Sequence, residues 1–166
     1  MWSVYGNKYG LETPLWRQLL ANAKGYEINR NFRMEIVELE TAFEVFLYEY
    51  LKPKLKPLFT EPIVETIFKH FRRMEDVTTL VFEMATGKKL REILKEANLE
   101  KLYGVWKEFG KDKRDKILHR GEEVSKSEAK KAFEAVFKMI VFLEPKSLEY
   151  LKTSLEEHKS LKHDFP

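Results

Sequence analysis

Apolar residues recur every three or four positions along the chain, and no stretch alternates apolar and polar residues as a half-buried strand would. This spacing places the apolar side chains on one face of an α-helix, whereas a strand needs a period of two. Glycine and proline fall between the periodic stretches, where they begin or end helices. We therefore expect an all-α protein of five to seven helices.

Start and stop signals set the expected helix boundaries. Thr13 and Asn98 are expected N-caps, and Ser125 with Glu128 forms a capping-box pattern. Gly121 is placed to end the helix that begins after Asn98. The expected helices span residues 13–30, 31–51, 61–87 as one helix or two, 88–97, 98–121, 125–145 and 146–158.

The helical phase also predicts which side chains pack inside. Trp16 and Trp106 are interpreted as core residues because they lie in phase with leucines, and Leu15 and Ile63 are expected on the apolar faces of their helices. Lys113 interrupts the apolar stripe of the 98–121 helix. Short connections make neighbouring helices antiparallel, so residues 1–166 are expected to form a single-domain antiparallel helical bundle.

Composition excludes several classes of protein. Without cysteine there is no disulfide framework, no thiolate catalysis and no sulfur-ligated metal, and the four scattered histidines predict no metal site and no cofactor. The N-terminus does not resemble a signal peptide, and no apolar run is long enough for a bilayer. We expect a cytoplasmic protein with no membrane partner. Its Lys- and Glu-rich composition suits a thermophile.

The positive charge is concentrated in one segment. Residues 107–120 contain six Lys or Arg and three acidic residues, which equals the net charge of +3 of the whole chain. Charge alone leaves two interpretations open: a solvated helix face, which it favours, and a helix end that follows a phosphate backbone. The residues expected to contact RNA phosphates are Lys113, Lys116 and Arg120.

The same segment places an arginine, an acid, a histidine and a glycine at fixed offsets. Asp115 and His119 are four residues apart, so the acid is expected to hold the imidazole. Arg114 and His119 are five apart, or roughly 140° around a straight helix, and do not converge. For both to act on one phosphate, the helix must end near His119, as Gly121 predicts, or two chains must meet around a two-fold axis.

Arg114, Asp115, His119 and Gly121, near the end of one helix and before a capped helix, resemble the signature of the HEPN family (higher eukaryotes and prokaryotes nucleotide-binding). The family pattern is an Arg, four to six residues and a His, usually with a polar residue after the Arg. The stretch from Pro14 to Leu51 is similar to the first two helices of prokaryotic HEPN domains. The resemblance covers about residues 14–143, and implies a four-helix core with additional short helices. We expect residues 146–166 to form a C-terminal helix and tail.

The resemblance implies a metal-independent endoribonuclease that acts as a homodimer on single-stranded RNA. His119 would exchange the proton of the RNA 2′-hydroxyl, because imidazole takes and gives protons near neutral pH. Arg114 would hold the scissile phosphate with its planar fork, and Asp115 would orient the histidine. Attack by the 2′-hydroxyl leaves a 2′,3′-cyclic phosphate and requires RNA.

Two other classes of function remain open. One is a non-catalytic RNA- or nucleotide-binding module, or the HEPN component of a toxin–antitoxin or defence system with a nucleotidyltransferase-type operon partner. Some toxin members carry a tyrosine shortly after the histidine, whereas Arg120 and Gly121 follow it here. The other class is a helical interaction protein in which Arg114 and Asp115 are surface charges.

Overall fold

The computed structural model describes residues 13–147, and every regular element in that range is helical. The expected all-α fold is confirmed. The elements are α1 (Leu15–Ile28), α2 (Phe32–Leu55), α3 (Glu61–His70), α4 (Met74–Asp76), η1 (Val77–Val81), α5 (Phe82–Thr86), α6 (Leu90–Glu96), α7 (Glu100–Trp106), η2 (Lys107–Lys111), α8 (Asp112–Arg120) and α9 (Lys126–Leu143). The two η segments are single turns of π-helix.

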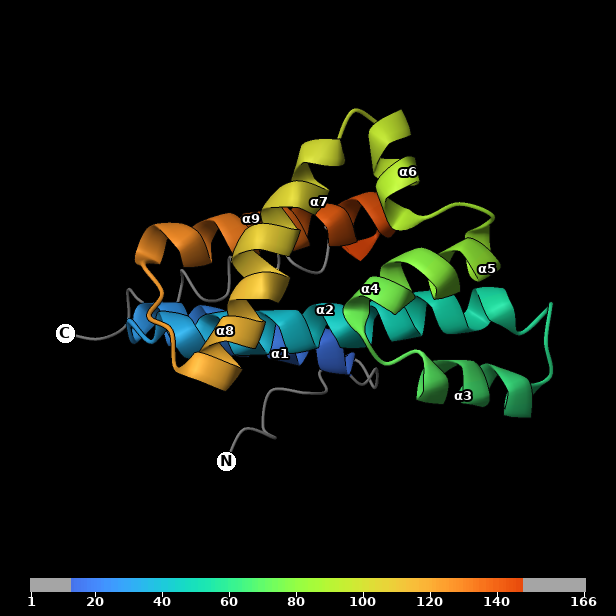
Figure 1. The fold of residues 1–166 in the computed structure, drawn as a ribbon, viewed down its shortest axis with the longest axis horizontal. Coiled ribbons are helices and arrows are strands. Elements are labelled where there is room, and N and C mark those ends of the chain that lie inside the picture. The colour runs from blue at the N-terminus through green and yellow to red at the C-terminus, as the bar shows by residue number, and fades with distance from the viewer. Residues whose placement is uncertain (1–12, 148–166) are drawn as a thin grey trace.

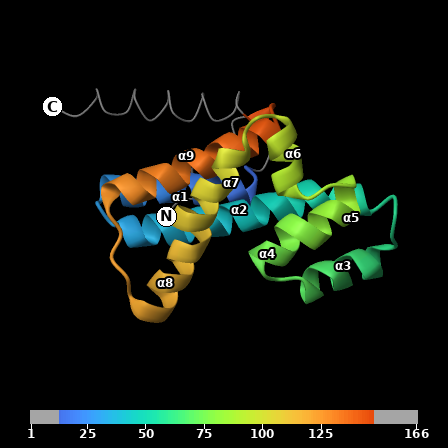
Figure 2. The same cartoon turned by 45° about the horizontal axis from the view of Figure 1, so that its top comes forward.

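Helix α2 is the central element of the bundle. It packs against α1, α9, α8, η2 and α5, and Figure 1 shows α1 and α9 running along it while α7 and α8 cross it steeply. The crossing is equally clear in the second view (Figure 2). The core of α2 is a row of apolar side chains at steps of three and four: Ile36, Leu39, Phe43, Phe46, Leu47, Leu51 and Leu55.

The first helix buries the face that was expected, except at Leu15. Trp16 is buried and meets the ring of Phe46 edge to face at 5.3 Å, as its core position predicted. Leu15 was expected on the apolar face but is 52% exposed. The reason is that the buried face runs through Trp16, Leu20 and Ala23, and Leu15 lies beside it. The cap prediction is also wrong by one residue, since Pro14 rather than Thr13 precedes the first turn.

One expected boundary is wrong. Helix α2 continues through Pro53 to Leu55, because burial of Leu51 and Leu55 outweighs the loss of one backbone hydrogen bond. The 61–87 stretch, expected as one helix or two, forms two helical units, with an extended backbone around Phe71 and Arg73 between them. Gly87 takes φ 83° and ends the second unit as predicted.

Helix α3 departs from the expected apolar face at Ile63. Ile63 is 47% exposed, while its neighbour Val64 is fully buried. The helix lies at one end of α2 with a single buried side chain, so most of its surface faces solvent.

The segment from Glu100 to Arg120 is one continuous helical rod, in which η2 joins α7 to α8 with helical backbone angles at both joints. Asn98 was expected to cap this rod. Instead it takes a left-handed conformation (φ 59°) and ends α6. The amides of Asn98 and Leu99 donate to the carbonyls of Lys95 and Leu94 at 3.0 and 2.7 Å, which is a Schellman motif.

Helix α9 begins at the predicted capping box. The Ser125 hydroxyl accepts from the Glu128 amide at 3.2 Å, and the Glu128 carboxylate accepts from the Ser125 amide at 2.8 Å. The helix expected at 146–158 lies almost entirely outside the described residues. Within residues 13–147, none of the helices has the length and apolar character needed to cross a bilayer.

We predict that Ser125→Ala lowers the free energy of unfolding by about 1 kcal/mol, because the amide of Glu128 loses its acceptor. Ser127→Ala is the matched control, since Ser127 is an exposed serine in the same first turn. Urea denaturation of both variants measures the difference. Equal stabilities would show that the capping box contributes nothing to α9.

Candidate functional site

Helix α8 carries the Arg-to-His motif and ends where predicted. Gly121 takes φ 63°, and its amide donates to the carbonyl of Ile117 at 2.9 Å. Arg33, in the first turn of α2, donates to the Gly121 carbonyl at 3.3 Å and lies 3.4 Å from the carboxylate of Glu123. The end of α8 is therefore tied to the beginning of α2, and His119 lies in its last turn.

Arg114 points toward α2. Its Nη1 lies 3.7 Å from Oε2 of Glu44, and the side chain is 27% exposed. Its Nε is buried and has no hydrogen-bond partner within residues 13–147. The guanidinium is thus partly enclosed, with its charge balanced by an acid of its own chain.

The structure does not bring Asp115 and His119 together. The Asp115 carboxylate lies 3.5 Å from Nζ of Lys111, one turn earlier, and not beside the imidazole. His119 is exposed and makes no side-chain hydrogen bond or ion pair within the described range. The expected support of the histidine by Asp115 is therefore not formed in a single chain.

Lys113 is not a surface cation, although we had expected it to contact RNA. Its side chain is 10% exposed, and its Nζ lies 2.6 Å from Glu122 and 2.9 Å from Glu128. These two acids raise the pKa of Lys113. These two ion pairs balance the charge of Lys113, which interrupts the apolar stripe of the helix. The pair with Glu128 joins α8 to the start of α9.

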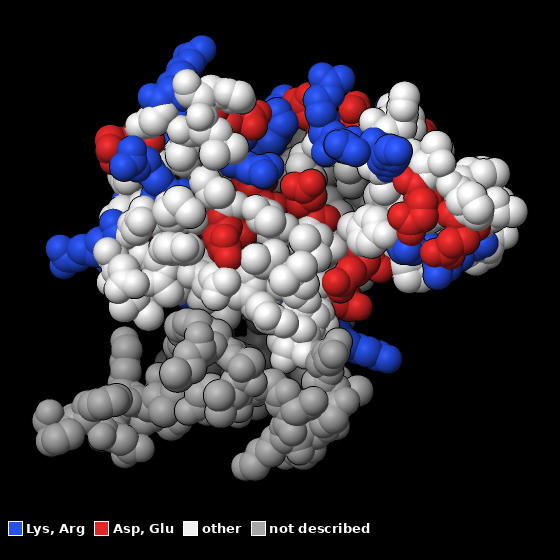
Figure 3. Space-filling model, turned by 90° about the horizontal axis from the view of Figure 1, so that it is seen from below, with Lys and Arg blue, Asp and Glu red and all other residues white. Residues whose placement is uncertain are grey.

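Two of the other four cations in the basic segment also have partners. Lys107 and Lys111 lie 3.9 and 3.3 Å from Oε1 of Glu75. Together with Lys113 and Arg114, four of the six cations are paired; only Lys116 and Arg120 are exposed without an ion pair in the part of the chain described. Figure 3 shows Lys and Arg side chains gathered along the upper margin of one face, with acidic side chains among and below them. The surface is mixed in sign rather than uniformly basic.

A buried carboxyl group lies under the motif helix, and our sequence reasoning missed it. Glu40 of α2 is fully buried, and both of its carboxyl oxygens accept from Nε1 of Trp106, at 3.0 and 3.1 Å. Gly110, one turn later, leaves room for this carboxyl, since a methyl group there would overlap Oε1 of Glu40. The signal was present, because Glu40 lies at a core position between Leu39 and the buried Phe43.

Burial raises the pKa of two carboxyl groups on α2. It raises the pKa of Glu40 to about 8, against the opposing effects of the Trp106 hydrogen bond and the Arg114 charge. It also raises the pKa of Glu35 to about 7, helped by the negative charge of Glu27. Neither oxygen of Glu35 has a partner within residues 13–147. Both groups carry a proton at slightly acid pH, because an unpaired charge costs more in the interior.

The described residues hold no group of three or more His, Asp or Glu side chains arranged for a metal ion. Comparison with known protein families, with curated proteins and with solved structures finds no match to this chain.

We predict that Gly110→Ala lowers the free energy of unfolding by about 1–3 kcal/mol, because the new methyl group must displace the Glu40 carboxyl. Gly104→Ala is the control in the same helical rod. A methyl group there meets nothing within 4 Å, so it should stabilise the helix by up to ~1 kcal/mol. Thermal and urea denaturation compare the two; effects of the same sign would contradict the packing described.

We also predict that the protein loses stability as the pH rises from about 5 to 8. The folded-state pKa of Glu40 is about 8, above the ordinary value of 4.5. Its contribution is therefore complete below about pH 4.5 and is lost as the pH rises through 8. Glu40→Gln should make the fall of the unfolding free energy with pH shallower, by up to ~1.4 kcal/mol per pH unit. Urea denaturation at several pH values measures it, with the exposed Glu134→Gln as control; an unchanged slope in Glu40→Gln would contradict the prediction.

Proposed function

We propose that this chain binds single-stranded RNA and cleaves it without a metal ion, at a site assembled from two copies of the chain. The observation that carries the proposal is the split placement of the motif. His119 is exposed in the last turn of α8, while Arg114 lies a turn earlier and points toward Glu44 on α2. Neither residue has the other as a neighbour in one chain, and a second copy supplies the missing half.

The chemistry of the two side chains suits RNA. His119 takes the proton of the 2′-hydroxyl while the 2′-oxygen attacks the neighbouring phosphorus. The bond from phosphorus to the 5′-oxygen breaks, and the 5′-oxygen takes a proton from water. The products are a 2′,3′-cyclic phosphate and a 5′-hydroxyl. Arg114 is 27% exposed, and its open side stabilises the negative charge that develops on the phosphate.

Three features of the surface support this assignment. Lys116 and Arg120 are exposed without ion pairs in the described range and lie on the same helix as the motif, where they suit RNA phosphates. Leu118, next to His119, is 58% exposed, and an exposed apolar side chain suits contact with a second copy. The HEPN resemblance of the motif points the same way.

A non-catalytic RNA-binding module, in a toxin–antitoxin or defence system, is the second candidate. It is favoured by the pairing of Arg114 with Glu44 and of Asp115 with Lys111, which gives both residues a role within the chain. In that case the protein binds RNA but leaves it intact.

We predict that the wild-type protein cleaves single-stranded RNA in EDTA, and that His119→Ala abolishes cleavage while most RNA affinity remains. Arg114→Lys should lose most activity, because it keeps the charge but loses the planar fork. Gel analysis of labelled RNA, with mass spectrometry of the cyclic phosphate, measures both. Arg73→Lys is a control for a general arginine effect, since Arg73 is exposed, pairs with Asp76 and lies outside the motif helix.

Mixing the two inactive variants tests the composite site. If one chain supplies Arg114 and the other His119, mixed dimers hold one intact site, and activity should return to about a quarter of the wild-type value by statistics of random pairing. Activity that stays absent on mixing contradicts a site shared between chains. Cleavage that needs magnesium and survives His119→Ala contradicts the whole mechanism.

A further inference from the structure

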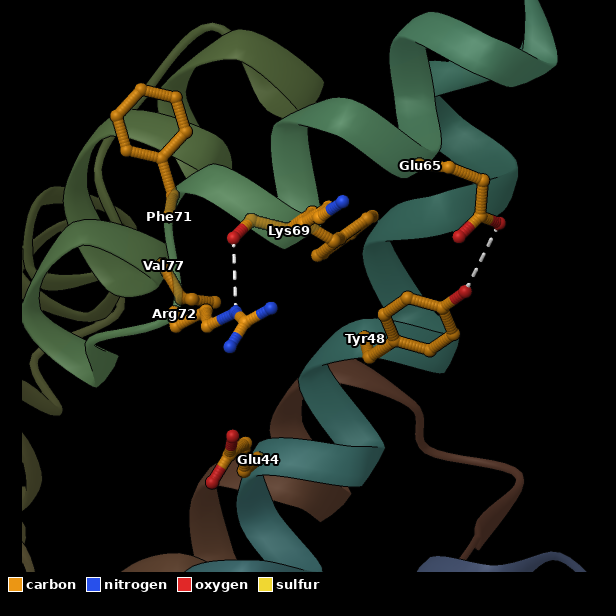
Figure 4. A pocket seen from close by; sticks show the side chains of 8 residues that line it. Glu44, Tyr48, Glu65, Lys69, Phe71, Arg72 and Val77 are labelled. Atoms are coloured by element: carbon orange, nitrogen blue, oxygen red, sulfur yellow. Dashed lines mark hydrogen bonds between the residues drawn. The ribbon is translucent and has the colours of Figure 1, made fainter.

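A pocket of about 320 Å³ opens between α2, α3 and the extended link that follows α3, close to the motif helix. Figure 4 shows side chains from all three segments turned toward it. The lining residues are Glu44, Tyr48, Glu65, Phe68, Lys69, Phe71, Arg72 and Val77. Its size matches the lower end of the range for small-molecule sites.

The charge of this pocket is effectively positive. Its two acidic residues are balanced by cations that do not line it: Glu44 lies 3.7 Å from Arg114, and Glu65 pairs with Lys52. Its two cations, Lys69 and Arg72, make no ion pair within residues 13–147. The uncompensated charge that faces the cavity is therefore cationic and suits an anion.

The position of the Arg72 fork is fixed by the backbone. Its Nε donates to the carbonyl oxygen of Lys69 at 3.0 Å, where α3 ends. Figure 4 shows the guanidinium extending over the cavity toward Tyr48 and Glu44. Its two terminal nitrogens are directed at the space that a ligand would occupy, and a planar fork of this kind suits a phosphate.

The opposite wall is aromatic. Tyr48 and Phe68 meet edge to face with ring centroids 4.5 Å apart, and so form an apolar corner. The Tyr48 hydroxyl is held by two hydrogen bonds, to Glu65 at 3.3 Å and from Lys52 at 3.0 Å. A rigid aromatic corner opposite a cationic fork suits a ligand with a planar ring and a phosphate.

A second pocket, of about 420 Å³, differs in how far its cations are paired with acids. It is lined by more cations, but Lys107 and Lys111 share Glu75, and Arg91 lies 2.8 Å from Glu100. Those charges are largely satisfied within the chain. The smaller pocket is thus the better site for an anionic ligand.

We propose that the pocket between α2 and α3 binds one nucleotide, with its base against Tyr48 and Phe68 and its phosphate on Arg72 and Lys69. Glu44 lines the pocket and pairs with Arg114, so a nucleotide in the pocket lies next to the motif helix. That this nucleotide belongs to an RNA strand rests on the proposed function. The pocket would then hold the residue that neighbours the scissile phosphate.

The test uses the His119→Ala protein, so that RNA stays intact while binding is measured. Phe68→Ala should weaken binding of an oligouridine about fivefold or more, because one base loses its aromatic support. Arg72→Gln should weaken it about tenfold, because a charged hydrogen bond to phosphate is lost. Ile63→Ala, exposed on the same helix, and Arg73→Gln, with the same change of charge, are matched controls that should change affinity little.

Titration with uridine monophosphate separates a free nucleotide from an RNA residue. Weaker binding of either probe by the pocket variants supports the site. The probe whose affinity falls shows whether the site takes a free nucleotide or a nucleotide within RNA. Oligouridine carrying 5-iodouridine should crosslink to Tyr48 or Phe68. Absence of binding of both probes, affinities that do not change in the pocket variants, or crosslinks confined to α8 would overturn the inference. RNA that binds through the pocket but is never cut overturns the proposed cleavage and leaves the nucleotide site standing.

Discussion

The rod that carries the motif helix meets the central helix at a buried polar contact, where the Trp106 indole donates to both oxygens of the Glu40 carboxyl. It joins the rod that contains α8 to the central helix at their crossing, and Gly110 allows the close approach. The π-turn of η2 lies at the same place. An insertion of this kind rotates the following helix relative to the preceding one, so the crossing also sets which way α8 faces.

The locations of the candidate site residues follow from that crossing. Arg114 comes one turn after Gly110 and is therefore directed toward Glu44 on α2, while His119 lies beyond the contact and is exposed. Acidic residues of the same chain pair with four of the six cations in residues 107–120. A segment that is basic in sequence thus presents only Lys116 and Arg120 as unpaired charges within the described range. The same Glu44 borders the pocket between α2 and α3, so the motif and the pocket share one side chain.

Much of the local structure was predictable from the sequence. The capping box at Ser125, the stops at Gly87 and Gly121, and the core position of Trp106 all follow from a few neighbouring residues, and the structure confirms them. The errors have two causes. Packing of Leu51 and Leu55 carries α2 through a proline. Asn98 suits two local roles, and it ends one helix in a left-handed conformation instead of starting the next.

The sequence by itself determined the all-α class, because periodicity and caps are properties of each helix alone. Only the tertiary structure decided the partners of the charged groups: Lys113 with Glu128, Arg114 with Glu44, and Glu40 with Trp106. These pairs lie across helix contacts, and Arg114 and Glu44 are 70 positions apart. A single helix's pattern identifies its own inward face, but the charge or cavity that this face meets depends on how the helices cross.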